Sequence, residues 1–320
     1  MTPAFGARPL VTGAAGFAGS HLVDRLRESH ERLYAWSNPA SGRKHDRPGV
    51  QWDQVDLVDL AAIERAISTA RPSFIFHCAG IPQVAESWSH ADRALRVNAF
   101  GTHLLLEAVR NAGLTCPILV VGSALVYRPS SNPLHEEAPL GPRDPYGISK
   151  LAQEMVGMRA STPVLIARPF NHAGPRQPSS FVTSSFARQV AEIEAGLSEP
   201  ILRVGNLDAR RDVTDVRDIV RGYEALAASG RHRVPYNLCS GNAYRVGDLL
   251  DILLTMSRVS VRVEQDPARL RPSDNPLVQG DPSRIAKDTG WRAEIPIERT
   301  MSDLLDWWRA QLTADRGARE

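Results

Sequence analysis

The sequence is poor in cysteine, in long apolar runs and in excess charge of either sign. Its three cysteines, Cys78, Cys116 and Cys239, are scattered and lack metal-ligand spacing, which argues against a disulfide framework and a structural zinc. We expect them to be reduced core residues of a cytoplasmic protein, and we expect no metal. No apolar stretch approaches the roughly 20 residues of a membrane span, so we expect no membrane partner. A net charge of +2 without any long basic or acidic block gives no indication of a nucleic-acid partner.

Short apolar runs and helical patterns alternate through the first half of the chain. With 320 residues, 42% of them hydrophobic, the chain is long enough for a full core and a second lobe. The predicted strands lie at 10–11, 32–36, 74–78, 117–122 and 164–167, and the predicted helices at 19–28, 61–69, 102–111 and 146–158. This alternation predicts an α/β fold with a doubly wound parallel sheet (Rossmann) that is covered on both faces.

The character of the chain changes after residue 169. Loops become longer and richer in proline, arginine and aspartate, while helices are predicted at 184–195 and 297–312 and a strand at 236–239. We therefore expect a dinucleotide-binding domain over 1–170 that also receives a strand and a helix near 211–240. A smaller, interleaved substrate-binding domain takes up most of 171–320.

A glycine-rich turn lies between the first strand and the first helix. Gly13 permits a tight turn, Gly16 lets the backbone approach a pyrophosphate, and Gly19 lets helix and strand pack closely. The helix N-terminus, with Phe17 and Ala18, then faces the phosphates. The spacing is GxxGxxG rather than GxGxxG, and a plain structural turn is the alternative. The position near residue 10 and the strand–helix context favour a dinucleotide site.

The second strand ends without an acidic residue. A carboxylate there would bind the ribose 2′-hydroxyl of NAD, but Ser37 and Asn38 occupy the place. Arg43, Lys44 and Arg47 follow nearby, which slightly favours the 2′-phosphate of NADP. The alternative is that these basic residues belong to a solvated loop.

Tyr146 and Lys150 are four residues apart and share a face of a predicted helix. A free tyrosine has a pKa of about 10, and a nearby ammonium favours the tyrosinate; lowering the pKa to about 7 takes roughly 4 kcal/mol. Because the spacing alone is common, Ser123 is needed to complete the pattern. It follows the buried strand that ends at Gly122, at an edge where doubly wound sheets bind ligands. A capping serine is the alternative to a hydroxyl that holds the substrate carbonyl.

With these features the sequence resembles the extended short-chain dehydrogenase/reductase family, in its NAD-dependent epimerase/dehydratase branch. The motifs lie at 12–19 (TGAAGFAG), 76–80 (FHCAG), 98–101 (NAFG), 122–127 (GSALVY), 146–150 (YGISK) and 168–171 (RPFN). The resemblance implies that Ser123, Tyr146 and Lys150 are the catalytic triad and that Lys150 also holds the nicotinamide ribose. It also implies a homodimer formed through the helices at 102–111 and 146–158.

Further cofactor contacts follow from the same resemblance and from the ends of the predicted strands. The expected residues, besides those of the glycine turn, are Ser37, Arg43, Asp56, Leu57, Ala79, Gly80, Asn98 and Pro169. Asp56 follows a third strand and is a candidate for the adenine, although a surface aspartate is equally consistent with its position. His77 and His172 lie in family motifs, and we interpret both as structural because Tyr146 supplies the proton.

The second half resembles a narrower group, the GDP-mannose dehydratases and GDP-6-deoxy-4-keto-mannose reductases. The motifs are 168–175 (RPFNHAGP), 204–207 (VGNL), 211–218 (RDVTDVRD) and 269–272 (RLRP). The resemblance implies that Asn171, Arg188, Arg211 and Arg271 bind a GDP-sugar, and arginine forks suit the diphosphate. A surface ion-pair network around Arg211 is the alternative.

Position 125 separates the reactions of this group. Dehydratases carry a carboxylate two residues before the tyrosine of the GSALVY motif, and fucose-type epimerase/reductases carry a cysteine there and a histidine at position 176. This chain has Leu125 and Arg176, and leucine cannot act as a base. The residues that dehydration and double epimerisation require are therefore missing. Leu125 also departs from the reductases of the branch, so the identity of the sugar stays open.

The predicted activity is the NAD(P)H-dependent reduction of a 4-keto-6-deoxy nucleotide sugar. The first choice is reduction of GDP-6-deoxy-4-keto-D-mannose to GDP-D-rhamnose. One alternative is a nucleotide-sugar 4-epimerase with tightly bound NAD, which uses the same triad. An alternative of another class is a non-catalytic dinucleotide-binding regulator, since the fold alone does not determine function. The intact triad argues against the regulator.

Overall fold

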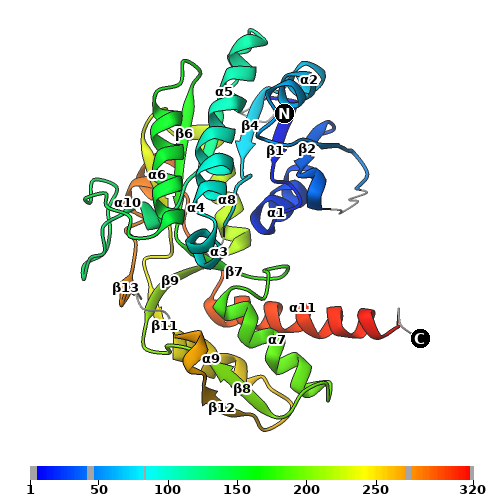
Figure 1. The fold of residues 1–320 in the computed structure, drawn as a ribbon, viewed down its shortest axis with the longest axis vertical. Helices are drawn as coiled ribbons and strands as arrows, with labels where there is room; N and C mark the ends of the chain where they lie inside the picture. The colour runs from blue at the N-terminus through cyan, green and yellow to red at the C-terminus, as the bar shows by residue number, and fades with distance from the viewer. Residues whose placement is uncertain (1–5, 42–46, 83, 271–274, 318–320) are drawn as a thin grey trace.

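The protein has two lobes, a larger one built around a parallel sheet and a smaller one below it in Figure 1. The structure, a computed structural model, describes residues 6–41, 47–82, 84–270 and 275–317. Within these residues no helix is both long and apolar enough to cross a bilayer.

The sheet of the larger lobe has seven parallel strands in the order β10-β6-β5-β4-β1-β2-β3. They are β1 (Pro9–Thr12), β2 (Leu33–Ser37), β3 (Val50–Gln54), β4 (Phe74–His77), β5 (Ile118–Val121), β6 (Val164–Pro169) and β10 (Pro235–Leu238). The predicted doubly wound sheet is thereby confirmed. Because the chain proceeds outward from β1 in one direction and from β4 in the other, the order reverses between these two strands. Ligands bind at such a reversal, beyond the carboxyl ends of the strands.

Helices cover both faces of this sheet (Figure 1). One face is covered by α1 (Phe17–Leu26), α8 (Val216–Ser229) and α10 (Ser283–Thr289), and the other by α2 (Leu60–Ala70), α5 (Gly101–Asn111) and α6 (Pro145–Met158). Burial on both sides explains why the first three residues of β4 and all of β5 are apolar without alternation.

Aspartates fix where several of these helices begin. The side chain of Asp59 accepts a hydrogen bond from Ala62 N at 3.1 Å, and that of Asp144 accepts one from Gly147 N at 2.8 Å. Pro145 in the first turn of α6 suits a helix start, because it has no N–H to satisfy. The predicted helices at 61–69 and 146–158 are therefore found within one residue of their expected bounds, whereas α1 begins two residues earlier than predicted, directly after Gly16.

Short helical segments connect β4 to α5 and β5 to α6. They are α3 (Val84–Ser89), α4 (Ala91–Leu95), the π-helical turn η2 (Arg96–Phe100) and the 3₁₀ turn η3 (Ala124–Val126). Two further 3₁₀ turns are η1 (Pro39–Ser41) and η4 (Pro267–Arg269). The turn η2 runs directly into α5 and carries Asn98.

The smaller lobe packs two small sheets against three helices. A four-stranded sheet holds β7 (Asn171–Ala173), β9 (Arg210–Asp215), β11 (Ala243–Arg245) and β13 (Leu277–Val278), and a pair holds β8 (Ile201–Val204) and β12 (Arg262–Gln265). The helices α7 (Val182–Glu194), α9 (Val246–Thr255) and α11 (Ile297–Gly317) enclose its own apolar core. Between β9 and β11 the chain returns to the larger lobe as α8 and β10. The proposed domain boundary near residue 170 stays a prediction.

Candidate active site

The glycine turn after β1 has the shape that a dinucleotide requires. Gly13 has φ +66°, and a Cβ at this position would lie 2.6 Å from Ala79 Cα. A Cβ at Gly19 would lie 2.2 Å from Gly13 O, so helix and loop meet without room for side chains. Gly16 caps α1 without a side-chain hydrogen bond, which leaves the first N–H groups of this ten-residue helix for an anion. These residues fit a bound pyrophosphate.

The other predicted cofactor residues lie along the same edge of the sheet. Phe17 and Ala18 form the first turn of α1; Ser37 and Pro169 end β2 and β6; Asp56 and Leu57 follow β3; Ala79 and Gly80 follow β4; Asn98 lies in η2. Arg43 lies outside the described residues. The carboxyl ends of these strands thus bring together residues that are far apart in the sequence, and their contacts with a cofactor stay predictions.

The side chain of Asn98 makes hydrogen bonds to other residues of the protein. Its Oδ1 accepts a hydrogen bond from Ile81 N at 2.8 Å, and its Nδ2 donates to Ser149 Oγ at 2.9 Å. Ser149 in turn donates to Tyr146 O at 2.7 Å. The side chain of Asn98 therefore ties the turn after β4 to the start of α6.

The three predicted catalytic residues come together between β5 and α6. Ser123 lies close enough to the hydroxyl of Tyr146 to act on its pKa, and Ser123 Oγ accepts a hydrogen bond from Leu125 N at 3.1 Å. Lys150, one turn further along α6, donates to Val121 O and to Gln153 Oε1, both at 2.7 Å. Ser123, Tyr146 and Lys150 are 7%, 9% and 5% exposed, so this polar group is almost fully removed from solvent.

The protonation of Tyr146 differs from the sequence prediction. Burial raises its pKa to about 12; the hydrogen bond from Ser123 opposes this rise and the charge of Asp144 adds to it. Burial outweighs the predicted lowering by Lys150, whose ammonium is directed at Val121 O and Gln153. Burial lowers the pKa of Lys150 to about 8. At neutral pH Tyr146 is therefore a proton donor beside a mostly charged lysine.

The backbone of η3 packs directly against the first turn of α6. A Cβ at Gly147 would lie 2.5 Å from Leu125 O, so the two segments approach as closely as glycine permits. This contact fixes Ser123, which caps η3, relative to Tyr146. Leu125 is half-buried, and it offers no titratable group at the position where a base would be needed.

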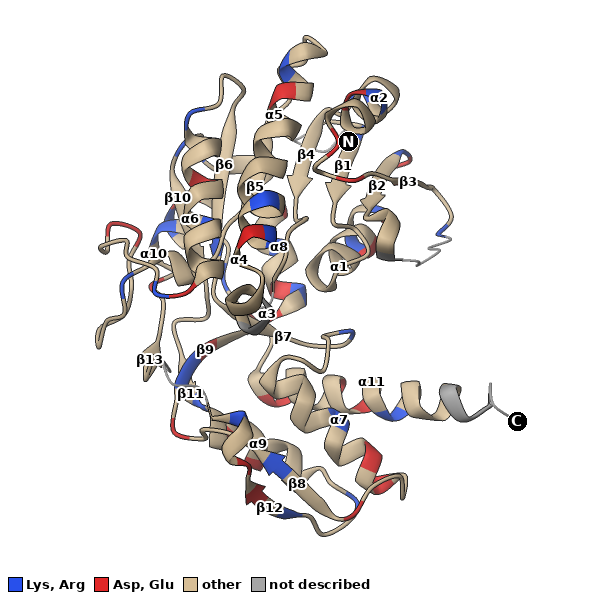
Figure 2. Cartoon of the chain, viewed as in Figure 1, with Lys and Arg blue, Asp and Glu red and all other residues tan. Residues whose placement is uncertain are grey.

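The predicted substrate residues lie on three elements of the smaller lobe. Asn171 is an exposed residue at the start of β7. Arg188 on α7 donates to Glu192 Oε1 at 2.7 Å and lies over the ring of Trp308. Arg211 on β9 donates to Asn275 O at 2.6 Å; Figure 2 shows this basic stretch at the junction of the lobes. Their contacts with a substrate stay predictions, and Arg271 lies outside the described residues.

A buried ion pair that was not predicted from the sequence joins β6 to α6, the helix that carries Tyr146 and Lys150. Arg168 Nε donates to Glu154 Oε2 at 2.9 Å, and a second bond joins Nη2 to Oε1. Arg168 Nη1 also donates to Tyr127 Oη at 2.8 Å, and Tyr127 donates to Asn237 Oδ1 at 2.7 Å. This group joins the end of η3 to α6, β6 and β10. A buried arginine has no signal of its own in a single sequence, apart from its place in the RPFN motif.

Two histidines join the lobes beside the glycine turn. His172 stacks on Phe17, with ring centroids 5.5 Å apart, as expected for a structural residue. His21 Nε2 is 2.8 Å from Pro175 O, and burial together with Arg176 lowers its pKa to about 4. Among residues 6–41, 47–82, 84–270 and 275–317, no group of three or more His, Cys, Asp or Glu side chains could hold a metal ion.

Comparisons with known proteins agree with this geometry. The family model described as GDP-mannose 4,6 dehydratase matches residues 10–304. GDP-6-deoxy-D-mannose reductase of Pseudomonas aeruginosa is 34% identical over 317 residues, which cover 95% of this chain and 98% of that protein. The structure of RMD from Pseudomonas aeruginosa complexed with NADPH has a TM-score of 0.84 and 32% identity, covering 95% and 99% of the two chains. UDP-glucose 4-epimerase of Thermotoga maritima with UDP-glucose has a TM-score of 0.84 and 25% identity, with the same coverage.

Proposed function

Because the chain belongs to the GDP-mannose 4,6-dehydratase family, whose members here are NAD(P)-dependent nucleotide-sugar enzymes, we propose that it reduces a keto sugar. The substrate is GDP-4-keto-6-deoxy-D-mannose, the product is GDP-D-rhamnose, and the reductant is NAD(P)H. One observation carries the proposal: a buried, protonated Tyr146 lies beside Ser123, while the neighbouring position 125 holds leucine instead of a base.

The chain's residues supply the proton and orient the carbonyl. Bound NAD(P)H supplies the hydride. With the substrate bound, the hydroxyls of Ser123 and Tyr146 each donate to its carbonyl oxygen, and Tyr146 then transfers its proton to that oxygen. Lys150, one turn along α6, stabilises the tyrosinate that forms. Leu125 can remove no proton from the sugar carbons, so the reaction ends at the alcohol.

The end of β2 supports NADPH over NADH. Ser37 is buried there, and neither it nor Asn38 carries a negative charge that would repel a 2′-phosphate. Arg47 lies against α1, where it donates to Ser20 O at 3.2 Å. The relative from Pseudomonas aeruginosa was solved with NADPH, which agrees with this choice.

The test combines the protein, NADPH and GDP-4-keto-6-deoxy-D-mannose and follows the absorbance of the reduced cofactor. We expect stoichiometric oxidation of NADPH and a reduced sugar, with slower turnover of NADH. The uridine diphosphate form of the same keto sugar is the matched control, and it should react more slowly. Interconversion of an unreduced nucleotide sugar without cofactor oxidation would instead indicate the 4-epimerase, which needs the same triad. Cofactor binding without turnover of any nucleotide sugar would indicate a regulator.

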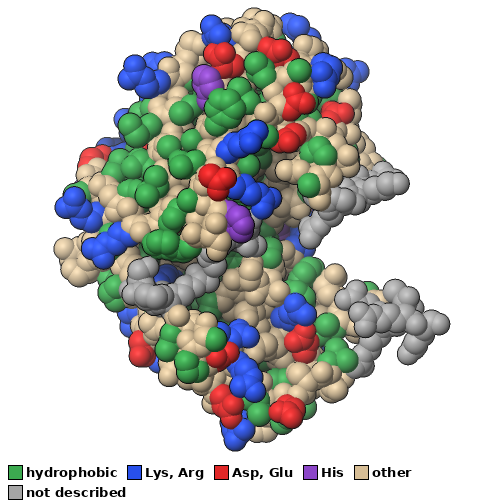
Figure 3. Space-filling model, viewed as in Figure 1, with side chains coloured by type: hydrophobic (Ala, Val, Ile, Leu, Met, Phe, Trp, Pro, Cys, Tyr) green, Lys and Arg blue, Asp and Glu red, His purple; other side chains and the backbone are tan. Residues whose placement is uncertain are grey.

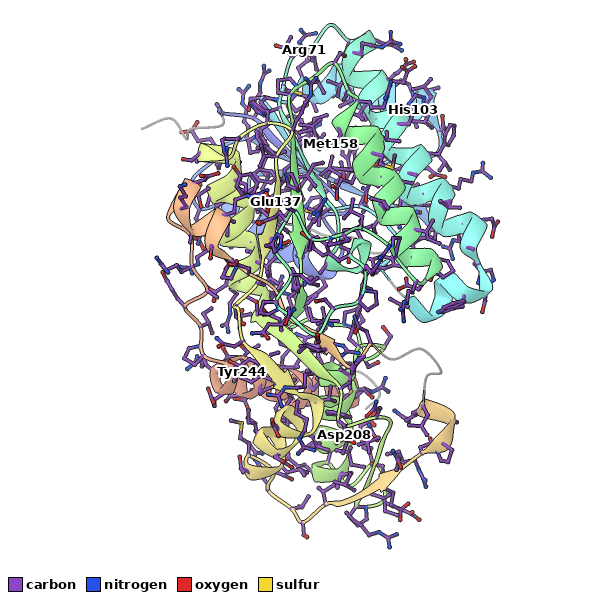
Figure 4. All side chains as sticks on the ribbon, turned by 90° about the vertical axis from the view of Figure 1, so that its left-hand side faces the viewer. Arg71, His103, Glu137, Met158, Asp208 and Tyr244 are labelled. Atoms are coloured by element: carbon purple, nitrogen blue, oxygen red, sulfur yellow. The ribbon has the colours of Figure 1, made fainter. Side chains whose placement is uncertain are left out.

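We further propose that two copies of the chain associate through α5 and α6. The apolar side chains Trp88, Leu95, Phe100, Ile148 and Met155 are 40–60% exposed on neighbouring helices of the larger lobe. Figures 1 and 4 show α5 and α6 side by side on the outside of that lobe, and Figure 3 shows apolar side chains gathered on this face. Exposed apolar side chains that gather on adjacent helices are typical of an isologous dimer interface.

Charge placed on that face should separate the dimer. The double variant Phe100→Arg/Met155→Arg should sediment as a monomer where the unchanged protein sediments as a dimer, because each copy would bury two unpaired charges. Leu197→Arg is the control, since Leu197 is 53% exposed but lies in the other lobe after α7. A monomeric unchanged protein, or a dimeric double variant, would contradict this interface.

A cytoplasmic location stays a prediction. Its support is that Cys78, Cys116 and Cys239 are all unpaired, the state in which a reducing compartment keeps thiols.

A further inference from the structure

A continuous row of buried polar side chains runs from the catalytic lysine to the glycine turn. We call it the buried polar chain; its members are Lys150, Gln153, Thr102, His77 and Thr12. Lys150 Nζ lies 2.7 Å from Gln153 Oε1, Gln153 Nε2 lies 3.0 Å from Thr102 Oγ1, and His77 lies 2.8 Å from both threonines. All five are at most 5% exposed.

The backbone carbonyl of Asn98 fixes the direction of every bond at the centre of this chain. Thr102 Oγ1 lies 2.6 Å from Asn98 O, and a carbonyl can only accept, so the single hydroxyl proton of Thr102 is committed there. Thr102 must then accept from both Gln153 Nε2 and His77 Nε2. His77 therefore carries its proton on Nε2 and accepts from Thr12 at Nδ1. Burial and the charge of Lys150 lower the pKa of His77 to about 3, so the ring is neutral.

The same count of donors and acceptors fixes the orientation of the side-chain amide of Gln153. The reverse orientation would direct its NH₂ group at the ammonium of Lys150 and its oxygen at Thr102, whose proton is already used. Only the observed orientation satisfies both neighbours. The amide oxygen that faces Lys150 is thus held in place by α5 and by the end of β4, and through Thr12 by the glycine turn itself.

The end of β5 and the buried polar chain accept from two of the three N–H groups of Lys150. Of its three N–H groups, one is directed to Val121 O and one to Gln153 Oε1. A Cβ placed on Gly80 would lie 3.6 Å from Nζ, so Nζ lies beside the turn that follows β4. Gly80 follows β4 at the edge where the glycine turn would hold a dinucleotide, so the third N–H is available for the cofactor and Tyr146.

We propose that Gln153 is a positioning residue for Lys150: its amide oxygen, oriented by Thr102 and His77, keeps the ammonium charged and aimed at the cofactor side. The importance of this role for catalysis rests on the proposed function, to which it adds the residue that holds Lys150. The titratable groups facing Lys150 are His77 and Cys78 at the end of β4 and Tyr146 on its own helix. Burial lowers the pKa of His77 and raises those of Cys78 and Tyr146, so all three are neutral at pH 7. The acceptors that stabilise the ammonium are therefore Val121 O and Gln153.

The small number of lysines allows the position of Lys150 to be tested without measuring turnover. Only three of its 38 basic residues are lysines, namely Lys44, Lys150 and Lys287. Labelling the lysine side chains with ¹³C at Cε gives three NMR signals, whose shifts report the pKa of each ammonium during a pH titration. Lys150→Arg assigns the signal of Lys150, and the other two lysines serve as internal references. The readout stays valid even if the substrate proves different from the one proposed.

Two substitutions of Gln153 should move the pKa of Lys150 in opposite directions. In the unchanged protein we expect a midpoint near 8. Gln153→Leu removes an acceptor worth one hydrogen bond to a charged group and should lower the midpoint by about one pH unit or more. Gln153→Glu places a carboxylate beside the ammonium and should raise it by about one to three units. Midpoints within about 0.3 units of the unchanged protein in both variants would overturn the proposal.

A matched pair of threonines tests the rest of the chain. Thr102→Val keeps the shape but removes the hydroxyl that orients Gln153, so the midpoint of Lys150 should fall, by less than in Gln153→Leu. Thr162→Val deletes another buried hydroxyl, one that donates to Cys116 O at 2.9 Å far from the site, and should leave the midpoint unchanged. An equal effect of both valine variants, or no effect of Thr102→Val, would contradict the role assigned to Gln153. This comparison can be made even if the Gln153 variants fail to fold.

Discussion

Replacing Tyr146 by phenylalanine should reduce turnover by about 10²- to 10⁴-fold, the usual contribution of a general acid. The substitution removes only the hydroxyl beside Ser123 that would protonate the carbonyl oxygen. Cofactor affinity should change little, because Lys150 is held by Val121 O and Gln153 and not by the tyrosine. Single-turnover kinetics with saturating NADPH, together with a cofactor titration, would separate the two effects.

Tyr236→Phe is the matched control for that experiment. Tyr236 lies at the start of β10, away from the carboxyl edge of the sheet. It is fully buried, and its hydroxyl donates to Asp288 at 2.8 Å. This variant should keep its turnover. If Tyr146→Phe also kept full turnover, the proton would have to come from another group, and the role given to Tyr146 would be wrong.

Replacing Glu154 by leucine should destabilise the protein by about 3–5 kcal/mol, the cost of leaving one partner of a buried ion pair without its counter-charge. Arg168 is 3% exposed, and Glu154 is its only carboxylate partner among the described residues. The free energy of unfolding from urea denaturation would measure the effect. Because Arg168 also donates to Tyr127, we expect the connection between η3 and α6 to loosen as well.

An exposed pair provides the comparison. Glu264 pairs with Arg262 on the surface of β12, and Glu264→Leu should change the free energy of unfolding by no more than about 1 kcal/mol. A Glu154→Leu variant as stable as Glu264→Leu would show that the buried pair contributes no more than a surface one.

The parts of the fold that local patterns determine could be predicted from the sequence. The apolar run of β4 followed by Gly80, and the Asp144–Pro145 pair before Tyr146, indicate a buried strand and a helix start by themselves. Because the carboxyl ends of parallel strands meet at one edge, the sequence alone is enough to place Ser123 near Tyr146. The glycine turn follows from the same topology.

Features that depend on distant partners could not be predicted. The strand β9 contains two arginines and two aspartates, yet Asp212 within it is fully buried. Its carboxylate accepts from Ser240 N, Gly241 N and Gly280 N, and these residues come together only in the folded chain. The strands β7 and β13 have three and two residues, too few for any period to show.

The direction of the Lys150 side chain is a similar case. Its spacing from Tyr146 predicted a mutual interaction that lowers the pKa of the tyrosine, but burial raises that pKa to about 12. Burial of the hydroxyl explains the difference, and the ammonium itself is bonded to Val121 O and Gln153. Spacing on a helix indicates which side chains share a face, whereas the acceptors around that face decide which of them bond.

The fate of hydrogen in the product tests the central claim most directly. The protein is given GDP-4-keto-6-deoxy-D-mannose and NADPH that carries deuterium at its transferable position, in ordinary water, and the product is examined by NMR. We predict one deuterium at C4 of a reduced sugar. The same reaction with unlabelled NADPH in D₂O should add no carbon-bound deuterium at C3 or C5 beyond that found without protein. Enzyme-dependent solvent deuterium at C3 or C5, or a product without cofactor deuterium at C4, would contradict a simple reduction with Tyr146 as the proton donor.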